Sequence, residues 1–333
     1  MNNTFSTYYT VYDRPAWVYN PYTGEKVTSG QHIWYIVDSC LTRNFRKFVI
    51  MDVIGVLGLI ALFTTLLIHP SLTLGIERME AHYSTFPDSA QVDYYRNTLY
   101  DYEAEFYDEA LDAMLRCKDG IDAPKGMSKS DVMKIIESVK MDHPEIFWTA
   151  RWVVHGFNGN CGVIFEYIIT DPEEITRKAN DYEQIAYNVI YDFASDYDPD
   201  SNEYKSELAK YLYGWVCENA SYVSDSGNGY DQTIMGVFEG NGCVCAGYSR
   251  AYKYLCDKAG IPCYYVSGST SKMSRDSTHA WNIVAIDGEE LHYVDVTWGD
   301  DDESNIDWCW YTEDETTFEK SHKAISLDVN DIC

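Results

Sequence analysis

Positive charge is scarce in this sequence. Only 25 Lys and Arg residues stand against 53 Asp and Glu residues, which gives a formal net charge of −28 at pH 7. A chain this acidic repels nucleic acid phosphates and anionic lipid head groups, so the composition excludes binding to a nucleic acid backbone. Positively charged substrates remain compatible with the charge, but a solvated acidic surface is the simpler interpretation.

Internal repeats, low-complexity tracts and zinc-type spacings are also missing. Cys243 and Cys245 lie too close together for the usual structural zinc sites, and no cysteine pair has a two-residue spacer. The acidic segment 196–207 has the carboxylate spacing of a calcium loop, but Ser201 stands where the loop needs glycine. We interpret that segment as a solvated turn, and we expect neither a metal site nor a cofactor.

One long apolar run predicts a membrane segment at residues 48–69. Its core, 48–68, carries Asp52 as its sole charged side chain. At a rise of about 1.5 Å per residue this core spans roughly 31 Å, close to the thickness of a bilayer interior. A buried helix of a soluble protein rarely runs this long without polar interruption, so we predict a transmembrane helix.

The flanks of this run predict its orientation. Arg43, Arg46 and Lys47 precede it, and the positive-inside bias places residues 1–47 in the cytoplasm as a tail. The remainder would lie outside the cell, attached to the cell membrane by a single pass. A cleavable signal peptide fits poorly, because the preceding region is too long and no clear small-residue cleavage site follows.

Nine cysteines follow the apolar run. One nucleophile would leave an even number that could form disulfides outside the cell, but the sequence does not show which pairs form.

Periodicity and capping residues predict the order of elements. Residues 71–170 are predicted to form a mainly helical extension, with Ser130 as the cap of a helix at 128–140. The other predicted elements are a small hairpin at 17–27, helix at 71–120, strand-like structure at 147–169, and helices at 172–193 and 203–219.

Cys245 precedes a predicted helix at 246–259, which ends at Gly260. At a helix N-terminus the backbone N–H groups and the dipole favour negative charge, which lowers the pKa of a thiol. Most cysteines are small buried hydrophobes, so this position alone leaves a structural role open.

A strand is predicted at 263–268, after this helix. Two more strands follow it in the chain. They span 279–286 and 291–298, and a turn at 287–289 reverses the chain between them.

Register then decides which side chains share a face of the sheet. A three-residue loop pairs Ile286 with Glu290, which sets Asp295 opposite Trp281. His279 lies on the same side of the sheet one diagonal away, so the carboxylate can reach the imidazole. A shift by one residue would place Asp295 and His279 on opposite faces.

The motifs CAGY at 245–248, HAWN at 279–282 and YVDVTW at 293–298 together resemble the bacterial transglutaminase-like superfamily. The resemblance covers roughly residues 183–307, with the three motifs in the family order. It extends weakly upstream to DHPE at 142–145.

This resemblance implies an α+β fold of the papain and transglutaminase type, in which a central helix packs on an antiparallel sheet within residues 171–325. It also implies a triad in which Cys245 is the nucleophile, His279 the base and Asp295 the group that orients the base. All three positions fit the family pattern. The superfamily includes transglutaminases, cysteine proteases, deglycosylating amidases and members that have lost catalysis.

The leading hypothesis is a membrane-anchored extracellular cysteine enzyme that attacks the amide carbonyl of a protein or peptide. The acyl-enzyme would be resolved by water or by a primary amine, and the sequence does not decide between them. The alternative is a catalytically silent surface module that binds a partner through its acidic, tyrosine-rich face. The oligomeric state is not indicated.

Overall fold

The computed structural model describes residues 8–10, 17–19, 26–28, 93–157, 159–198, 201, 203–224, 227, 229–271, 278–286, 290–301 and 305–327. The predicted transmembrane segment 48–69 lies outside these residues. Within the described ranges, no helix is both long and apolar enough to cross a bilayer. The chain divides into two units, Met1–Ser89 and Ala90–Cys333.

The first unit contains a small antiparallel sheet. Its three strands are β1 (Tyr8–Thr10), β2 (Trp17–Tyr19) and β3 (Lys26–Thr28). Because Trp17 pairs with Thr28 and Tyr19 pairs with Lys26, the hairpin predicted at 17–27 is confirmed.

The second unit begins with three helices and a three-stranded sheet. Their bounds are α4 (Tyr94–Asn97), α5 (Asp101–Leu115), α6 (Lys129–Asp142), β4 (Gly120–Asp122), β5 (Thr149–Phe157) and β6 (Asn160–Tyr167). The cap of α6 is Ser128 and not Ser130 as predicted. The Ser128 hydroxyl accepts the Asp131 N–H at 3.2 Å, and the Asp131 carboxylate accepts the Ser128 N–H at 3.3 Å.

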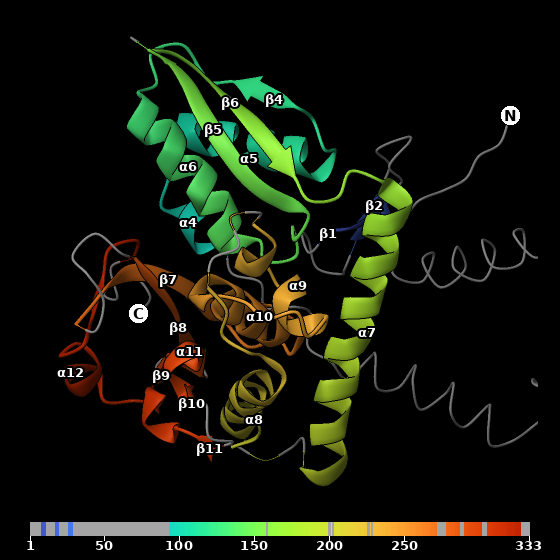
Figure 1. The fold of residues 1–333 in the computed structure, drawn as a ribbon, viewed down its shortest axis with the longest axis vertical. Helices are drawn as coiled ribbons and strands as arrows, with labels where there is room; N and C mark the ends of the chain where they lie inside the picture. Colours follow the sequence, from blue (N-terminus) through green and yellow to red (C-terminus); the bar gives the residue numbers. More distant parts are fainter. Residues whose placement is uncertain are drawn as a thin grey trace, which may run out of the picture. The chain divides into compact units, whose positions relative to one another are not determined.

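The helix that begins with Cys245 is α10 (Cys245–Lys258). Three other helices contact it, namely α7 (Pro172–Asp196), α8 (Tyr204–Asn219) and α9 (Met235–Phe238). Asp171 caps α7, with its Oδ1 accepting the Glu173 N–H at 3.0 Å. In Figure 1, α7 runs along one side of α8 and α10, and it contacts both.

A five-stranded antiparallel sheet supports α10. The strand order is β12–β9–β8–β7–β13, with β7 (Cys263–Thr270), β8 (His279–Ile286), β9 (Glu290–Val294), β12 (Tyr311–Thr312) and β13 (His322–Ala324). Helix α10 packs against β7 and β8, and Asn282 of β8 donates its side-chain amide to the Ser249 carbonyl at 3.1 Å. The α+β architecture, with a helix on an antiparallel sheet, is as expected.

A buried ion pair fastens α10 to the start of β7. The Lys253 ammonium donates to both Asp257 carboxylate oxygens and to the Cys263 carbonyl, each at 3.0 Å. Burial acts to raise the pKa of Asp257, whereas the charge and hydrogen bonds of Lys253 act to lower it. All three hydrogens of the ammonium are therefore used inside the core, and the bond to the Cys263 carbonyl holds α10 against β7.

The predicted register between β8 and β9 is confirmed, but the second strand is shorter than predicted. Ile286 pairs with Glu290, and the ladder ends at Val294. Asp295 then caps the short helix α11 (Val296–Gly299), so the residues predicted to extend the strand to Trp298 are helical. The side chain of Asp295 stops the strand because it satisfies the N–H of Trp298.

The remaining short elements return the chain to the far edge of the sheet. They are β10 (Asp300–Asp301), β11 (Asn305–Ile306), a 3₁₀ turn at Trp308–Trp310 and α12 (Glu315–Phe318). Phe318 packs with Trp281 and Tyr293 in a core that also includes Tyr94 and Tyr95 of the α4 region. This burial places β13 beside β7.

The described cysteines are all free thiols. They are Cys117, Cys161, Cys217, Cys243, Cys245, Cys256, Cys263 and Cys309. The disulfides that the even count allowed are therefore not formed among these residues, and Cys40 and Cys333 lie outside the described ranges.

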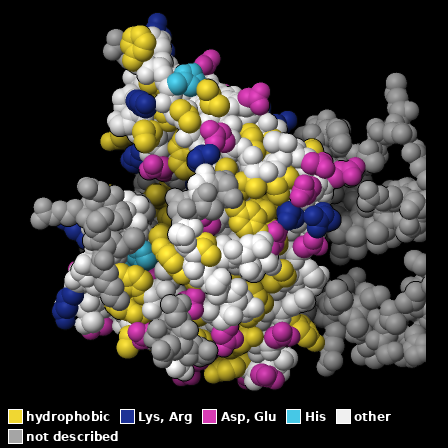
Figure 2. Space-filling model, in the orientation of Figure 1, with side chains coloured by type: hydrophobic (Ala, Val, Ile, Leu, Met, Phe, Trp, Pro, Cys, Tyr) yellow, Lys and Arg dark blue, Asp and Glu magenta, His cyan; other side chains and the backbone are white. Residues whose placement is uncertain are grey.

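Acidic side chains are spread over the visible described surface in Figure 2 and do not gather in one patch. This distribution fits a solvated acidic surface better than a single binding face for cations.

Candidate active site

Cys245 is the first residue of α10 and is half-buried. The residue before it, Val244, has no polar side chain to cap the first turn, and its carbonyl accepts the Gly247 N–H at 2.8 Å. The N–H groups of Cys245 and Ala246 are therefore the ones that the first turn offers to a ligand. Gly247 allows the preceding loop to approach closely. A Cβ at Gly247 would lie 2.5 Å from the Cβ of Cys243 and 2.7 Å from the carbonyl oxygen of Asp231.

His279 begins β8 and is buried. Its Nε2 lies 2.8 Å from Oδ2 of Asp295. Because a carboxylate only accepts hydrogen bonds, Nε2 carries the hydrogen. The Cys245 thiol also interacts with this ring and acts to raise its pKa.

The surroundings of His279 favour its protonated form. Burial acts to lower the pKa of the ring, but the hydrogen bonds to Asp295 and Cys245, together with their charges, raise it to about 9. At neutral pH the ring of His279 is therefore mainly the imidazolium, with a proton on each nitrogen.

Asp295 is fully buried and holds its position through both oxygens. Oδ1 accepts the N–H of Trp298 at 3.1 Å, while Oδ2 accepts the hydrogen bond from His279. Burial acts to raise the pKa of this carboxyl, but hydrogen bonds from His279 and His322 outweigh that effect and hold the pKa below its ordinary value.

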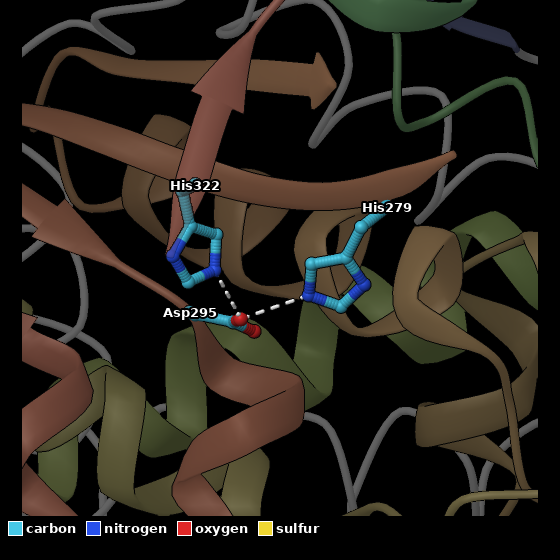
Figure 3. A group of neighbouring side chains, drawn as sticks. All are labelled: His279, Asp295 and His322. Atoms are coloured by element: carbon cyan, nitrogen blue, oxygen red, sulfur yellow. Dashed lines mark hydrogen bonds and ion pairs between the residues drawn. The ribbon is translucent and has the colours of Figure 1, made fainter. Parts of the chain in front are cut away.

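His322 is the residue that sequence reasoning missed. It begins β13, and its Nε2 lies 2.9 Å from Oδ2 of Asp295. In Figure 3 the two imidazoles flank the Asp295 carboxylate, and both dashed lines end on the same oxygen. No local pattern marks His322, because a three-residue edge strand has too little periodicity to be recognised.

Aromatic rings pack around the two imidazoles. Trp298 stacks on His279 at a centroid distance of 5.4 Å and an interplanar angle of 29°. Trp281 stands edge-on to His322 at 5.0 Å, and Phe318 stacks on His322 at 4.0 Å. These rings exclude water and restrict the rotamers of both histidines.

His279, Asp295 and His322 also form a group that could hold a metal ion, since one ligand atom from each lies within 4.8 Å of the others. However, Oδ2 itself lies at hydrogen-bond distance from both nitrogens, in the position between the imidazoles. Hydrogen bonds account for this geometry, and they leave the three side chains committed to one another.

The sequence match agrees with this geometry. Residues 173–297 match the transglutaminase-like superfamily, and the matched range contains Cys245, His279 and Asp295. Kyphoscoliosis peptidase of Mus musculus and that of Homo sapiens are each 26% identical over 104 residues, covering 28% of this chain and 16% of theirs. The match thus spans about a sixth of the length of these relatives.

Two solved structures are more distant. A TGase crystal structure has a TM-score of 0.27 and 14% identity, covering 54% of this chain and 50% of its own. A candidate cysteine protease from Cytophaga hutchinsonii has a TM-score of 0.30 and 13% identity, with 55% and 68% covered. These two likenesses carry no argument, and it is the sequence match that identifies a transglutaminase-like superfamily domain at residues 173–297, a class whose members are usually cysteine-dependent enzymes.

Proposed function

We propose that this protein is a cysteine enzyme that attacks an amide carbonyl of a protein or peptide substrate. The observation that carries the proposal is the bond of 2.8 Å between His279 Nε2 and Asp295 Oδ2, in a ring that also interacts with the Cys245 thiol at the start of α10. This order of groups is what a nucleophile and its base require.

The reaction follows from the positions of the groups. In the reactive form the proton of the Cys245 thiol is already on Nδ1 of His279, and the sulfur attacks the carbonyl carbon. The first-turn N–H groups of α10 stabilise the oxyanion. His279 then donates its proton to the departing amine as the C–N bond breaks, which leaves a thioester on Cys245.

A second nucleophile then resolves the thioester. Water or a primary amine loses a proton to His279, attacks the acyl carbon and releases the Cys245 sulfur, which recovers the proton. We place hydrolysis first, because the mouse and human relatives are named peptidases. Transamidation remains the second outcome of the same acyl-enzyme.

The test compares Cys245 with another thiol of the same chain. Cys309 is exposed, and its contact with Asp307 raises the pKa of its thiol. In the full-length chain near pH 7, Cys245 is expected to be alkylated by iodoacetamide at least about tenfold faster than Cys309, because the proposed reaction needs His279 to hold the proton of the Cys245 thiol. Peptide mass spectrometry separates the two sites.

Turnover gives the second readout. A glutamine-containing peptide library is incubated with a labelled primary amine, and new amino termini, ammonia and incorporated label are measured separately. The Cys245→Ala variant should abolish all three, while Cys309→Ala should leave them unchanged. Equal alkylation of both thiols, with no turnover by the unmodified chain, would instead identify a silent binding module, and turnover that persists in Cys245→Ala would refute Cys245 as the nucleophile.

We also propose that residues 48–69 anchor the chain in the cell membrane with the catalytic domain outside. The support is the apolar run and the three basic residues before it, Arg43, Arg46 and Lys47. Protease applied to intact cells should digest the C-terminal domain and spare residues 1–47. Protection of the C-terminal domain, with loss of the tail, would reverse the orientation.

A further inference from the structure

We propose that His322 is a positioning residue of this site, so that the working unit is the four-membered relay Cys245–His279–Asp295–His322. The inference rests on the proposed function. It concerns a residue outside the superfamily match, which ends at 297.

The contact pattern shows what His322 contributes. Three donors hold the Asp295 carboxylate: the Trp298 N–H on Oδ1, and the two histidine Nε2–H groups on Oδ2. A carboxylate with fewer donors can rotate and exchange its oxygens. With His322 in place, Oδ2 stays directed at His279, and the ring of His279 keeps its orientation toward the thiol.

The ring of His322 is itself fixed. Trp298 and Trp310 lie at centroid distances of 4.5 and 5.6 Å from it, beside the stacked Phe318. The Ser321 hydroxyl lies 2.8 Å from Nδ1 of His322. A neutral ring that accepts this hydroxyl at Nδ1 carries its hydrogen on Nε2, the atom that faces Asp295.

Packing alone does not account for a histidine in this position. The neighbours of His322 are aromatic rings, and a phenylalanine would fill such a site without the cost of burying two ring nitrogens. Two hydrogen bonds of the imidazole, one to Ser321 and one to Asp295, offset that cost. The polar contact with Asp295 is therefore what distinguishes histidine from an apolar ring here.

Because His279 and His322 share Oδ2 of Asp295, His322 also affects the pKa of His279. A donor from His322 spreads the negative charge of Oδ2 and weakens its attraction for the His279 proton. A neutral His322 does this by hydrogen bonding and a protonated one also by its charge, so both forms act in the same direction. Tyr213 and Cys217 of α8 also interact with Asp295, and burial raises the pKa of both, which leaves them neutral near pH 7.

The main test follows the titration of His279 in the full-length chain by histidine ¹⁵N NMR, with the signal assigned by its loss in His279→Gln. In His322→Phe the midpoint should rise by roughly one pH unit, a tenfold change in proton affinity. His322→Gln, which keeps a terminal N–H donor, should return the midpoint toward that of the unmodified chain. His292→Phe removes another buried histidine of the same sheet and should leave the midpoint unchanged.

Ser321→Ala covers the case in which His322→Phe does not fold. This variant keeps the imidazole and removes the group that holds its tautomer, so the His279 midpoint should move in the same direction by a smaller amount. An unchanged midpoint in a folded His322→Phe, or in Ser321→Ala if the former is unfolded, assigns His322 to packing alone and overturns the proposal.

The pH profile of iodoacetamide alkylation at Cys245 separates this inference from the proposed function. A fast Cys245 with a profile that His322→Phe does not change sinks the role of His322 and leaves the enzyme intact. A Cys245 that is no faster than Cys309 in the unmodified chain sinks the enzyme itself. A pH profile that shifts in His322→Phe and is restored in His322→Gln supports both the proposed function and the role of His322.

Discussion

Replacing Asp295 with Asn tests the electrostatics of the site most directly, because the amide keeps the shape and removes the charge. Among the contributions that raise the pKa of His279 to about 9, the hydrogen bond to Asp295 comes first, and burial opposes it. In Asp295→Asn we therefore expect the pKa of His279 to fall to its ordinary value of about 6.5 or lower.

The same shift predicts a change in stability with pH. Raising the pKa of His279 from 6.5 to about 9 corresponds to about 3 kcal/mol, at about 1.4 kcal/mol for each pKa unit. The folded-state pKa lies above the unfolded one, so this contribution is complete below pH 6.5 and is lost as the pH rises through 9. The free energy of unfolding lost in Asp295→Asn should therefore be largest below pH 6.5 and shrink toward pH 9.

Urea unfolding of the full-length chain between pH 6 and 10 measures this difference. The matched control is Asp314→Asn, which changes an exposed carboxylate that caps α12 through the Thr317 N–H. The control should cost stability by an amount that varies little over this range. A difference between the unmodified chain and Asp295→Asn that stays constant from pH 6 to 10 would refute the electrostatic account of His279.

Three further substitutions test the framework around the site. Lys253→Met leaves Asp257 buried without its cation and should cost about 3–5 kcal/mol in urea unfolding, whereas the double variant Lys253→Met/Asp257→Leu should recover most of that loss; a double variant as weak as the single one would contradict the pairing. Ser128→Ala removes the cap of α6 and should lower the free energy of unfolding by about 1 kcal/mol in the same measurement. An unchanged free energy of unfolding would show that the capping box does not stabilise the fold. Gly268→Ala would set a Cβ 2.1 Å from the Lys323 carbonyl, so β13 should detach from β7 and hydrogen exchange along β13 should accelerate; unchanged protection would contradict it.

Much of the local structure was predictable because it depends on neighbouring residues. The bounds of β8 match the prediction at both ends, and the turn length alone set the pairing of Ile286 with Glu290. The helix predicted at 172–193 begins at the predicted residue, although it continues three residues beyond the predicted end. In each case the controlling interaction joins residues close together in the chain.

Two features of the site escaped prediction, one local and one that joins distant residues. Asp295 ends its strand because its side chain accepts the Trp298 N–H, and an alternating pattern does not distinguish a strand residue from a helix cap. His322 reaches Asp295 only because burial of Phe318 among Trp281 and Tyr293 brings β13 to the sheet edge. Such an arrangement depends on the packed core and leaves no periodic signal in the sequence.

The edge position of β13 has a consequence for local opening of the fold. β13 has three residues and, among the described strands, pairs only with β7, at the outer edge of the five-stranded sheet. Short edge strands open at a lower free energy than central strands, so His322 is expected to separate from Asp295 more often than His279 does.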